Sequence, residues 1–257
     1  MAQSDHGALP IWFDGGIVRF QGDADLTDYH APLGSSIDPE MTVVAAEYAR
    51  HTFSFDSLPA EAVPALEGAL GRVGATYATR VHARALVLDL PQESGAWLSS
   101  LTKKHRHEVR RKQRRFVEVV GTPRYERRSD DEAFAAFVSM HRMADGEKGR
   151  FMTDQRVEFF RSLLAEAGGS IDLLSVEDRP VAAAFGFAEP GAYYLYNSAY
   201  DPALPSAAPG IVLLALMLDR SASDGTVRFD FLKGAERYKY HLGARERSLF
   251  VIEGVFA

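Results

Sequence analysis

The chain has 257 residues, of which 46% are hydrophobic and 25% are charged, and its formal net charge is −6. This composition is ordinary for a globular protein that can bury a sizeable core without metals or staples. The absence of cysteine excludes disulfides, zinc–thiolate sites and a cysteine nucleophile. No apolar run approaches the roughly 20 residues that span a bilayer, and the first ten residues lack a signal pattern. We therefore expect a cytoplasmic protein without a transmembrane segment.

The charge is unevenly distributed along the chain. A net charge of −6 gives the whole molecule no pull on nucleic acid, so no DNA partner is expected. Between residues 102 and 128, however, eleven Lys or Arg stand against three Glu. This basic segment requires a separate explanation.

The first part of the chain predicts a hairpin, two helices and three strands. The hairpin pairs residues 11–13 with 17–21 around Asp14-Gly15-Gly16. Asp38 as a cap and Pro39 at the first helical position predict a helix that runs to about Arg50. The further elements are strands at 52–56, 76–80 and 85–90 and a helix at 60–72.

The remainder predicts a basic helix followed by alternating helices and strands. The basic helix starts at Ser99 or Ser100, ends at Phe116 and carries one narrow apolar stripe. Strands at 171–176, 181–188 and 192–199 are joined by short turns, which predicts antiparallel neighbours. The other expected elements are strands at 117–127, 226–232 and 248–255, helices at 130–144, 154–167, 210–222 and 235–241, and a charged loop at 145–152.

A faint internal repeat relates the two parts. In each, a strand, a turn with Asp and Tyr, a helix and a strand with a Phe-Asp pair follow in order, and the pairs are Phe55-Asp56 and Phe229-Asp230. Two related units explain this order, with the first shortened at its front. A chance similarity of two βαβ segments explains it as well. If the units are related, the match of Asp56 with Asp230 favours a structural role for Asp230.

From residue 117 onward the element order resembles one complete domain of the GNAT acyltransferase superfamily. The sequence more specifically resembles the CelD/BcsL-like acetyltransferases, relatives of the Fem-type transferases. The segments that carry the likeness are 101–115, Tyr194-Leu-Tyr-Asn-Ser198 with Ala208-Pro-Gly-Ile211, and 229–239, together with Asp28-Tyr29. The resemblance implies an α/β (α+β) fold, a mixed and mainly antiparallel sheet flanked by helices, with tandem units. We expect a shortened unit at 8–97, a basic connecting helix at 98–116 and a complete unit at 117–257.

The resemblance also implies acetyl-CoA as co-substrate and no metal. The superfamily's phosphate loop reads Gln/Arg-x-x-Gly-x-Gly/Ala, whereas Pro205-Ser-Ala-Ala-Pro-Gly210 keeps only the last glycine. A helix N-terminus with small residues suits a pyrophosphate, although an ordinary Pro/Gly helix start reads the same. The expected cofactor contacts are Asn197, Ser198, Ala208, Pro209, Gly210 and Ile211.

The strand at 192–199 lies, in the resembled fold, beside the reactive acyl group. Alternation predicts Tyr194, Tyr196 and Ser198 on one face and Tyr193, Leu195 and Asn197 on the other. For most of these tyrosines the pattern favours a structural place in the sheet centre with satisfied hydroxyls, whereas the resemblance favours Tyr196, Asn197 and Ser198 as contacts.

A polar group follows the strand at 226–232. Acyl transfer to an amine needs a base for the ammonium proton and an acid for the departing thiolate. We expect Asp230 or Glu236 to act as the base through water, Tyr238 as the acid, and Lys239 or Lys233 to stabilise the oxyanion. A salt-bridged helix start is the structural alternative.

Acceptor binding is expected at the charged loop and the basic helix. The candidate residues are Lys148, Arg150, Tyr196, Lys233, Arg110 and Arg111. The basic helix can line a groove for an anionic glycan or nucleotide-linked precursor, hold the phosphates of coenzyme A, bind tRNA, or form a solvated face.

The sequence thus predicts an N-acetyltransferase or acyltransferase acting on a small-molecule or glycan-precursor acceptor. A Fem-type aminoacyl transferase that uses charged tRNA, and a non-catalytic binding protein on the same fold, are the alternatives. The acceptor, the acyl length and the oligomeric state are not specified by the sequence.

Overall fold

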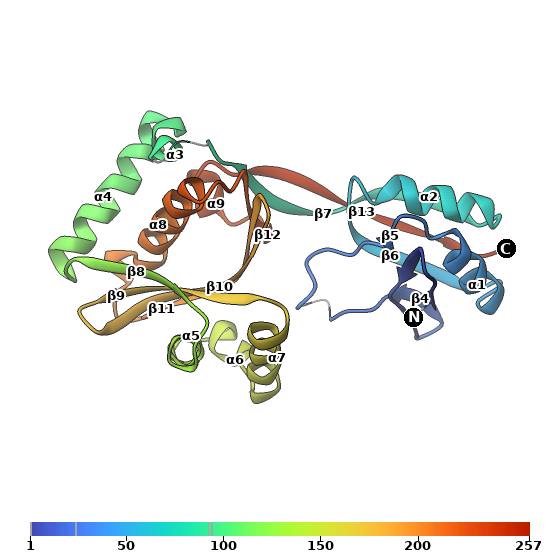
Figure 1. The fold of residues 1–257 in the computed structure, drawn as a ribbon, viewed down its shortest axis with the longest axis horizontal. Helices are drawn as coiled ribbons and strands as arrows, with labels where there is room; N and C mark the ends of the chain where they lie inside the picture. The colour runs from blue at the N-terminus through green and yellow to red at the C-terminus, as the bar shows by residue number, and fades with distance from the viewer. Residues whose placement is uncertain (1, 24, 92, 94) are drawn as a thin grey trace. The chain divides into compact units, whose positions relative to one another are not determined.

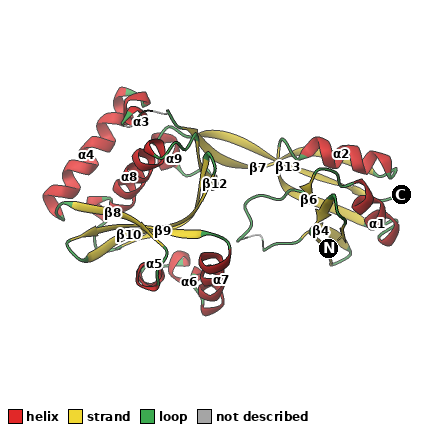
Figure 2. Cartoon of the chain, in the orientation of Figure 1, coloured by secondary structure: helices red, strands yellow, loops and turns green. Residues whose placement is uncertain are grey.

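The structure, a computed structural model, describes residues 2–23, 25–91, 93 and 95–257 (Figure 1). Backbone contacts divide them into two compact units. Unit 1 comprises the residues up to 85 with 233–235 and 246–257, and unit 2 comprises 86–232 and 236–245. Both mix helices with strands (Figure 2). The expected division into 8–97, 98–116 and 117–257 follows the sequence as tandem repeats and stays a prediction.

Unit 1 is built on strands in the order β3-β4-β6-β13-β7, beside a small sheet β1-β2-β5. Strands β7 and β13 also contribute residues to unit 2. The elements are β1 (Ala2–Gln3), β2 (Gly7–Leu9), β3 (Ile11–Asp14), β4 (Ile17–Phe20), β5 (Leu33–Gly34), α1 (Asp38–Glu47), β6 (Thr52–Pro59), α2 (Val63–Arg72), β7 (Thr76–Asp89) and β13 (Arg245–Val255). The predicted hairpin is confirmed, because β3 pairs antiparallel with β4 around Gly15 and Gly16.

Unit 2 carries strands in the order β12-β11-β10-β9-β8. The elements are α3 (Ala96–Ser100), α4 (Lys103–Val119), β8 (Pro123–Arg128), α5 (Asp131–Arg142), α6 (Glu147–Phe151), α7 (Asp154–Glu166), β9 (Gly169–Val176), β10 (Arg179–Glu189), β11 (Ala192–Tyr200), a 3₁₀ turn η1 (Pro205–Ala207), α8 (Pro209–Ser223), β12 (Arg228–Lys233) and α9 (Arg237–His241). Strands β9, β10 and β11 are antiparallel neighbours, as predicted.

Helices cover both faces of the unit 2 sheet, which explains why its central strand is apolar at nearly every position. On β10, Ala182 and Ala184 pack into a core with α4 and α8, which includes Phe116. The intervening Ala183 and Phe185 pack into a second core with α5 and α7.

Five predicted elements are corrected by the structure. Residues 76–80 and 85–90 form one continuous strand, β7. The basic helix is interrupted at Leu101, and Thr102 rather than Ser99 or Ser100 caps α4 by accepting the His105 N–H at 3.3 Å. The strand expected at 117–127 begins only at Pro123, because α4 continues to Val119. The charged loop contains the short helix α6.

The expected cap of the first helix is also wrong. Ile37 occupies the cap position without a side-chain hydrogen bond, and Asp38 already lies in the first turn. An acidic residue there still stabilises the helix through its dipole, so the composition signal was correct while its position was displaced by one residue.

A β-bulge at Tyr196 changes the predicted faces of β11. Asn197 pairs with Phe185, whereas Leu195 pairs with the next residue, Gly186, so Tyr196 is the extra residue. Cross-strand partners share a face, so Asn197 joins Tyr194 on the α5 side and Ser198 joins Tyr193 on the α8 side. The predicted alternation therefore holds up to Tyr196 and is wrong for Asn197 and Ser198.

The buried carboxylate of Asp172 ties three strands together on the α8 side. It accepts hydrogen bonds from the Tyr125 and Tyr193 hydroxyls and from Arg127 Nε, the last at 2.9 Å. The Arg127 guanidinium also lies 4.6 Å from the centre of the Tyr193 ring. Gly186 permits this arrangement, because a Cβ there would lie 2.1 Å from the Tyr193 hydroxyl.

We predict that Asp172→Asn lowers the free energy of unfolding by about 3 kcal/mol, since it leaves the partly buried Arg127 without its counter-ion. Denaturant unfolding would measure the change. Asp178→Asn, in the exposed turn after β9, should alter stability by less than about 0.5 kcal/mol. Equal losses in the two variants would contradict a central role for Asp172.

Candidate active site

Strands β11 and β12 run parallel but pair over only three positions. Ala192, Tyr193 and Tyr194 pair with Arg228, Phe229 and Asp230. Among the described residues β11 has no ladder partner on this side beyond Tyr194. An open strand edge offers unpaired backbone donors and acceptors that an extended ligand with amide groups can use.

The chain leaves β11 through η1 and enters α8 by a tight turn. Ala208 is the cap residue in the left-handed conformation, with φ 51°. It occupies the position where the resembled phosphate loop has its first glycine, and glycine adopts this conformation without steric cost. Ala208 thus holds a conformation that glycine adopts more readily.

Few backbone donors remain free at the start of α8. Pro209 has no N–H, and the N–H groups of Ile211 and Val212 both donate to the Ala208 carbonyl, at 3.0 and 3.2 Å. The Gly210 N–H donates to no group in the described part of the chain. An anion at this turn would therefore meet one free N–H and the positive end of the helix dipole.

Lys148 and Tyr200 lie next to this turn. The Tyr200 ring is 3.3 Å from where a Cβ on Gly210 would lie. The Lys148 ammonium lies 4.8 Å from the centre of the same ring, and its surroundings lower its pKa by desolvation. A cation predicted to bind the acceptor is thus brought to the phosphate-loop turn. Arg150, from the same helix α6, is exposed.

The buried side chain of His141 was missed by sequence analysis. It lies at the end of α5, packs edge-to-face on Phe137 at 4.8 Å and is 1% exposed. Neither ring nitrogen has a hydrogen-bond partner in the described part of the chain. Burial, and secondly the charge of Lys148, lower the pKa of His141 to about 4, against weaker opposing effects of Asn197 and the Lys148 backbone. The imidazole is therefore neutral at pH 7.

Asn197 and Ser198, both predicted to contact the cofactor, lie on opposite faces of β11. The Asn197 side chain accepts the Ser198 N–H at 2.7 Å and lies near His141. Tyr196, at the bulge, packs on Phe160 with ring centres 5.5 Å apart. Ser198 belongs to the α8 side.

The polar group after β12 is brought together around α9. Lys239 is buried, donates to the Phe231 carbonyl at 3.0 Å and pairs with Glu236 at 2.8 Å. Tyr238 is partly buried, and burial together with Glu236 raises its pKa. Asp230 is fully buried and accepts the Leu232 N–H at 2.8 Å, which holds Leu232 at a left-handed φ of 58°.

Lys233 belongs to unit 1. Its ammonium donates to the Thr27 carbonyl at 2.8 Å, and its N–H donates to the Asp28 carboxylate at 2.9 Å. In the same unit Asp56 binds His30 Nδ1 at 2.9 Å, so the two repeated aspartates, Asp56 and Asp230, make different contacts.

The basic helix α4 exposes most of its charges. Arg110 and Arg111 are exposed, and Arg111 forms a two-fold contact with Glu108 at 2.9 and 2.8 Å. Val109 and Phe116 bury the opposite side of the helix against α8.

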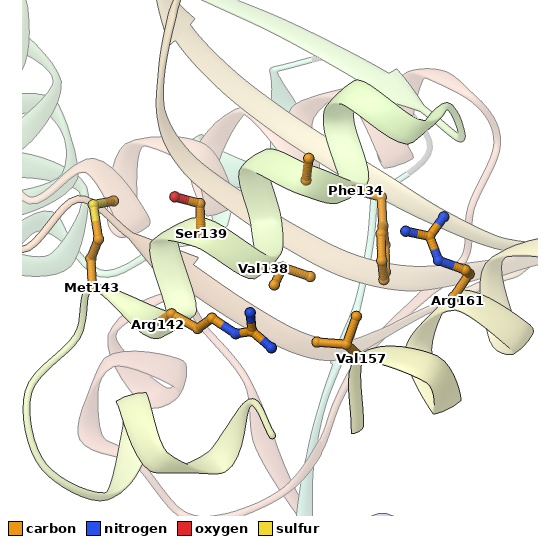
Figure 3. A pocket seen from close by; sticks show the side chains of 8 residues that line it. Phe134, Val138, Ser139, Arg142, Met143, Val157 and Arg161 are labelled. Atoms are coloured by element: carbon orange, nitrogen blue, oxygen red, sulfur yellow. The ribbon is translucent and has the colours of Figure 1, made fainter. Parts of the chain in front are cut away.

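A mainly apolar hollow lies on the outer side of α5 (Figure 3). Val138 and Val157 face each other across it, with Arg142 and Arg161 at its two ends. These arginines pair with Asp154 at 2.6 Å and Asp131 at 2.7 Å. His141, on the sheet side of α5, does not line this hollow.

The described residues contain no group of three or more His, Cys, Asp or Glu that could hold a metal ion. None of their helices is both long and apolar enough to cross a membrane.

The sequence model of the acetyltransferase (GNAT) domain family matches residues 103–240, more than half of the chain. No match was found among curated protein sequences. L-PGS from Bacillus licheniformis aligns with a TM-score of 0.64 at 10% identity, over 94% of this chain and 79% of that chain. FemX aligns with a TM-score of 0.61 at 10% identity, over 96% and 84%.

A tandem GNAT protein from the clavulanic acid biosynthesis pathway aligns with a TM-score of 0.51 at 13% identity, over 98% of this chain and 81% of that chain. At such identities these likenesses show the fold alone. The predicted fold class, a mainly antiparallel sheet flanked by helices and similar to tandem GNAT folds, is confirmed.

We predict that His141 makes the protein less stable as the pH falls from about 6.5 to about 4. In that window the unfolded state binds a proton that the folded state, with its lowered pKa, excludes. His141→Phe should therefore remove about 1–2 kcal/mol of the stability lost between about pH 7 and about pH 5. His6→Gln, at an exposed position, serves as the control in urea unfolding at both pH values. An unchanged pH dependence in His141→Phe would show that the imidazole titrates normally.

Proposed function

The chain belongs to the acetyltransferase (GNAT) domain family, and we propose that it transfers an acyl group, acetyl from acetyl-CoA, to an amine or hydroxyl. The acceptor is a sugar- or amino-acid-containing precursor, and the closer kinship is with the CelD/BcsL-like acetyltransferases. The observation that carries the proposal is the open edge of β11 beside the start of α8.

This edge and this turn can hold the two parts of an acyl carrier. Backbone groups of β11 beyond Tyr194 would pair with the carrier's amides, and Asn197 and Ser198 would contact the acyl end. The Ala208–Ile211 turn would receive the pyrophosphate through the Gly210 N–H. A single N–H donor binds a pyrophosphate weakly, so the Lys148 ammonium, beside Tyr200, would supply a positive charge as well.

The chemical step forms a bond from the acceptor nitrogen or oxygen to the carbonyl carbon and breaks the carbon–sulfur bond. A base takes the acceptor proton, and an acid protonates the departing thiolate. Tyr238 is the proposed acid: its phenol is protonated at pH 7, and its raised pKa makes it a weaker proton donor to the thiolate than an ordinary tyrosine. Lys239 would stabilise the oxyanion only if it leaves the Phe231 carbonyl.

Three groups compete as the base. Glu236 is half-exposed and can act through water, although it is paired with Lys239. Asp230 is buried and holds the Leu232 backbone, which favours a structural role. His141 is neutral and lies near Asn197, which makes it a candidate that sequence analysis did not include.

The acceptor would be bound by cations around the site. Lys148 and Arg150 on α6, with Tyr196 at the bulge, form one set. Arg110 and Arg111 on α4 form another, which suits an anionic acceptor. The Lys233 ammonium is held by the Thr27 carbonyl, so its proposed contact with substrate competes with that bond.

Aminoacyl transfer from charged tRNA is the second candidate. The fold likeness to FemX and L-PGS and the exposed basic helix favour it. Thermal shift separates the candidates: acetyl-CoA should raise the melting temperature under the first proposal and aminoacyl-tRNA under the second. No shift with either ligand would favour a non-catalytic binding protein.

We predict that Gly210→Glu weakens acetyl-CoA binding at least about tenfold in calorimetry, which is about 1.4 kcal/mol. The Glu side chain would bring a negative charge next to the free N–H. Gly210→Ala is the matched control, because its methyl group meets only the Tyr200 ring at 3.3 Å. Wild-type affinity in Gly210→Glu would place the pyrophosphate elsewhere.

We predict that Tyr238→Phe lowers kcat by about 10²–10³ while KM changes less than about threefold, the pattern of an interaction made mainly in the transition state. The control is Tyr240→Phe on the same short helix, which should turn over normally. If both variants keep the wild-type kcat on the true acceptor, Tyr238 is structural.

A further inference from the structure

A pocket of about 730 Å³ lies between α4 and α9, entirely within unit 2. None of its residues belongs to the η1–α8 turn. Its lining residues are Lys103, Lys104, His105, His107, Glu108, Lys112, Arg237 and His241. Four permanent cations and three histidines therefore surround a hollow with a single carboxylate.

The single carboxylate does not neutralise the pocket. Glu108 is already bound by Arg111 at 2.9 and 2.8 Å, and Lys112 lies 3.9 Å away. Lys103, Lys104 and Arg237 have no ion-pair partner in the described part of the chain. Unpaired cations that share one hollow repel each other and favour a bound anion.

The start of α4 adds to this field. Thr102 caps the helix by accepting the His105 N–H, which leaves the N–H groups of Lys103 and Lys104 without intrahelical partners. These donors and the positive end of the helix dipole lie among the pocket's own side chains. The helix terminus and the unpaired cations therefore favour the same charge.

Two histidines meet in the pocket. The rings of His105 and His241 lie with their centres 4.7 Å apart. Desolvation, His105, Arg237, Lys112 and Lys104 all lower the pKa of His241, in that order of size. An anion bound between these groups would raise the pKa of His241, because a nearby negative charge favours the protonated form of an imidazole.

We propose that the α4–α9 pocket binds a dianionic phosphate ester and that His241 takes up a proton from solvent as it does so. Binding and protonation are then linked, and affinity rises as the pH falls. Lys103, Lys104, Lys112 and Arg237 supply the fixed charge, and His107 lies at the wall. This site is separate from the proposed acyl-carrier turn and does not depend on it.

Inorganic sulfate is a suitable probe, since it stays dianionic over the range in which histidine titrates. At constant ionic strength we expect sulfate to bind at least about tenfold more tightly at about pH 5.5 than at about pH 7.5. Histidine ring signals in NMR spectra should show that sulfate raises the pKa of His241. His105→Asn with His241→Asn should abolish the pH dependence.

Lys104→Ala with Arg237→Ala should weaken sulfate binding at least about tenfold. Arg114→Ala with Arg115→Ala is the matched control, because it removes two exposed charges from α4 outside the pocket. Equal weakening in both double variants would overturn the proposal, since the effect would then be one of general charge. So would a sulfate affinity in the wild-type protein that does not change with pH.

The phosphate ester could come from coenzyme A or from RNA, and binding measurements with each ligand distinguish the two. Coenzyme A should bind more tightly than its analogue without the 3′-phosphate, in wild type but not in Lys104→Ala with Arg237→Ala, if the carrier fills the pocket. An RNA oligonucleotide with a 5′-terminal phosphate monoester should bind more tightly than the same oligonucleotide without it, in wild type but not in that variant, if nucleic acid does. If the double variant loses affinity for neither ligand, phosphate-ester binding in this pocket is refuted. The Gly210→Glu experiment would still test the acyl-carrier turn separately.

Discussion

The buried carboxylate of Asp172 is the interaction on which the unit 2 sheet depends. It joins β8, β9 and β11 through Arg127 and two tyrosine hydroxyls on the face that α4 and α8 cover. A fully buried charge is tolerable only when it is paired and hydrogen-bonded on several sides. Tyr193 can reach it because Gly186 carries no side chain. Because Gly186 must lie opposite the Tyr193 hydroxyl, the register of β10 against β11 is fixed next to the bulge.

The bulge and the parting of β11 from β12 then place the candidate site. The extra residue, Tyr196, moves Asn197 to the face that contains His141, while Ser198 turns toward α8. Beyond Tyr194 the backbone of β11 is released from β12 just before the chain turns into α8. Ala208 turns the chain into α8 with a left-handed backbone, where glycine would be less strained.

Strong periodic signals made most of the fold predictable from sequence. The three antiparallel strands, α7, α8 and the order after residue 123 follow from runs of apolar residues and short turns. The bulge was not predictable, because one extra residue leaves no compositional trace. His141 occupies a core-facing helical position, where a histidine looks like an ordinary apolar-face residue until its missing hydrogen bonds are known. Lys239 was correctly grouped with Glu236, but its contact with the Phe231 carbonyl needs the tertiary structure.

The interleaving of the two units has a consequence for how the chain folds during synthesis. Unit 1 includes both the earliest residues and 246–257, and its core contains Ile252 and Phe256 beside Phe53. Its β6 strand must wait for β13, made almost 200 residues later, before that edge is paired. Unit 2 can complete most of its contacts first. The growing chain therefore carries an unfinished sheet edge while almost 200 residues are added, and such an exposed edge is prone to aggregation and is a target for chaperones.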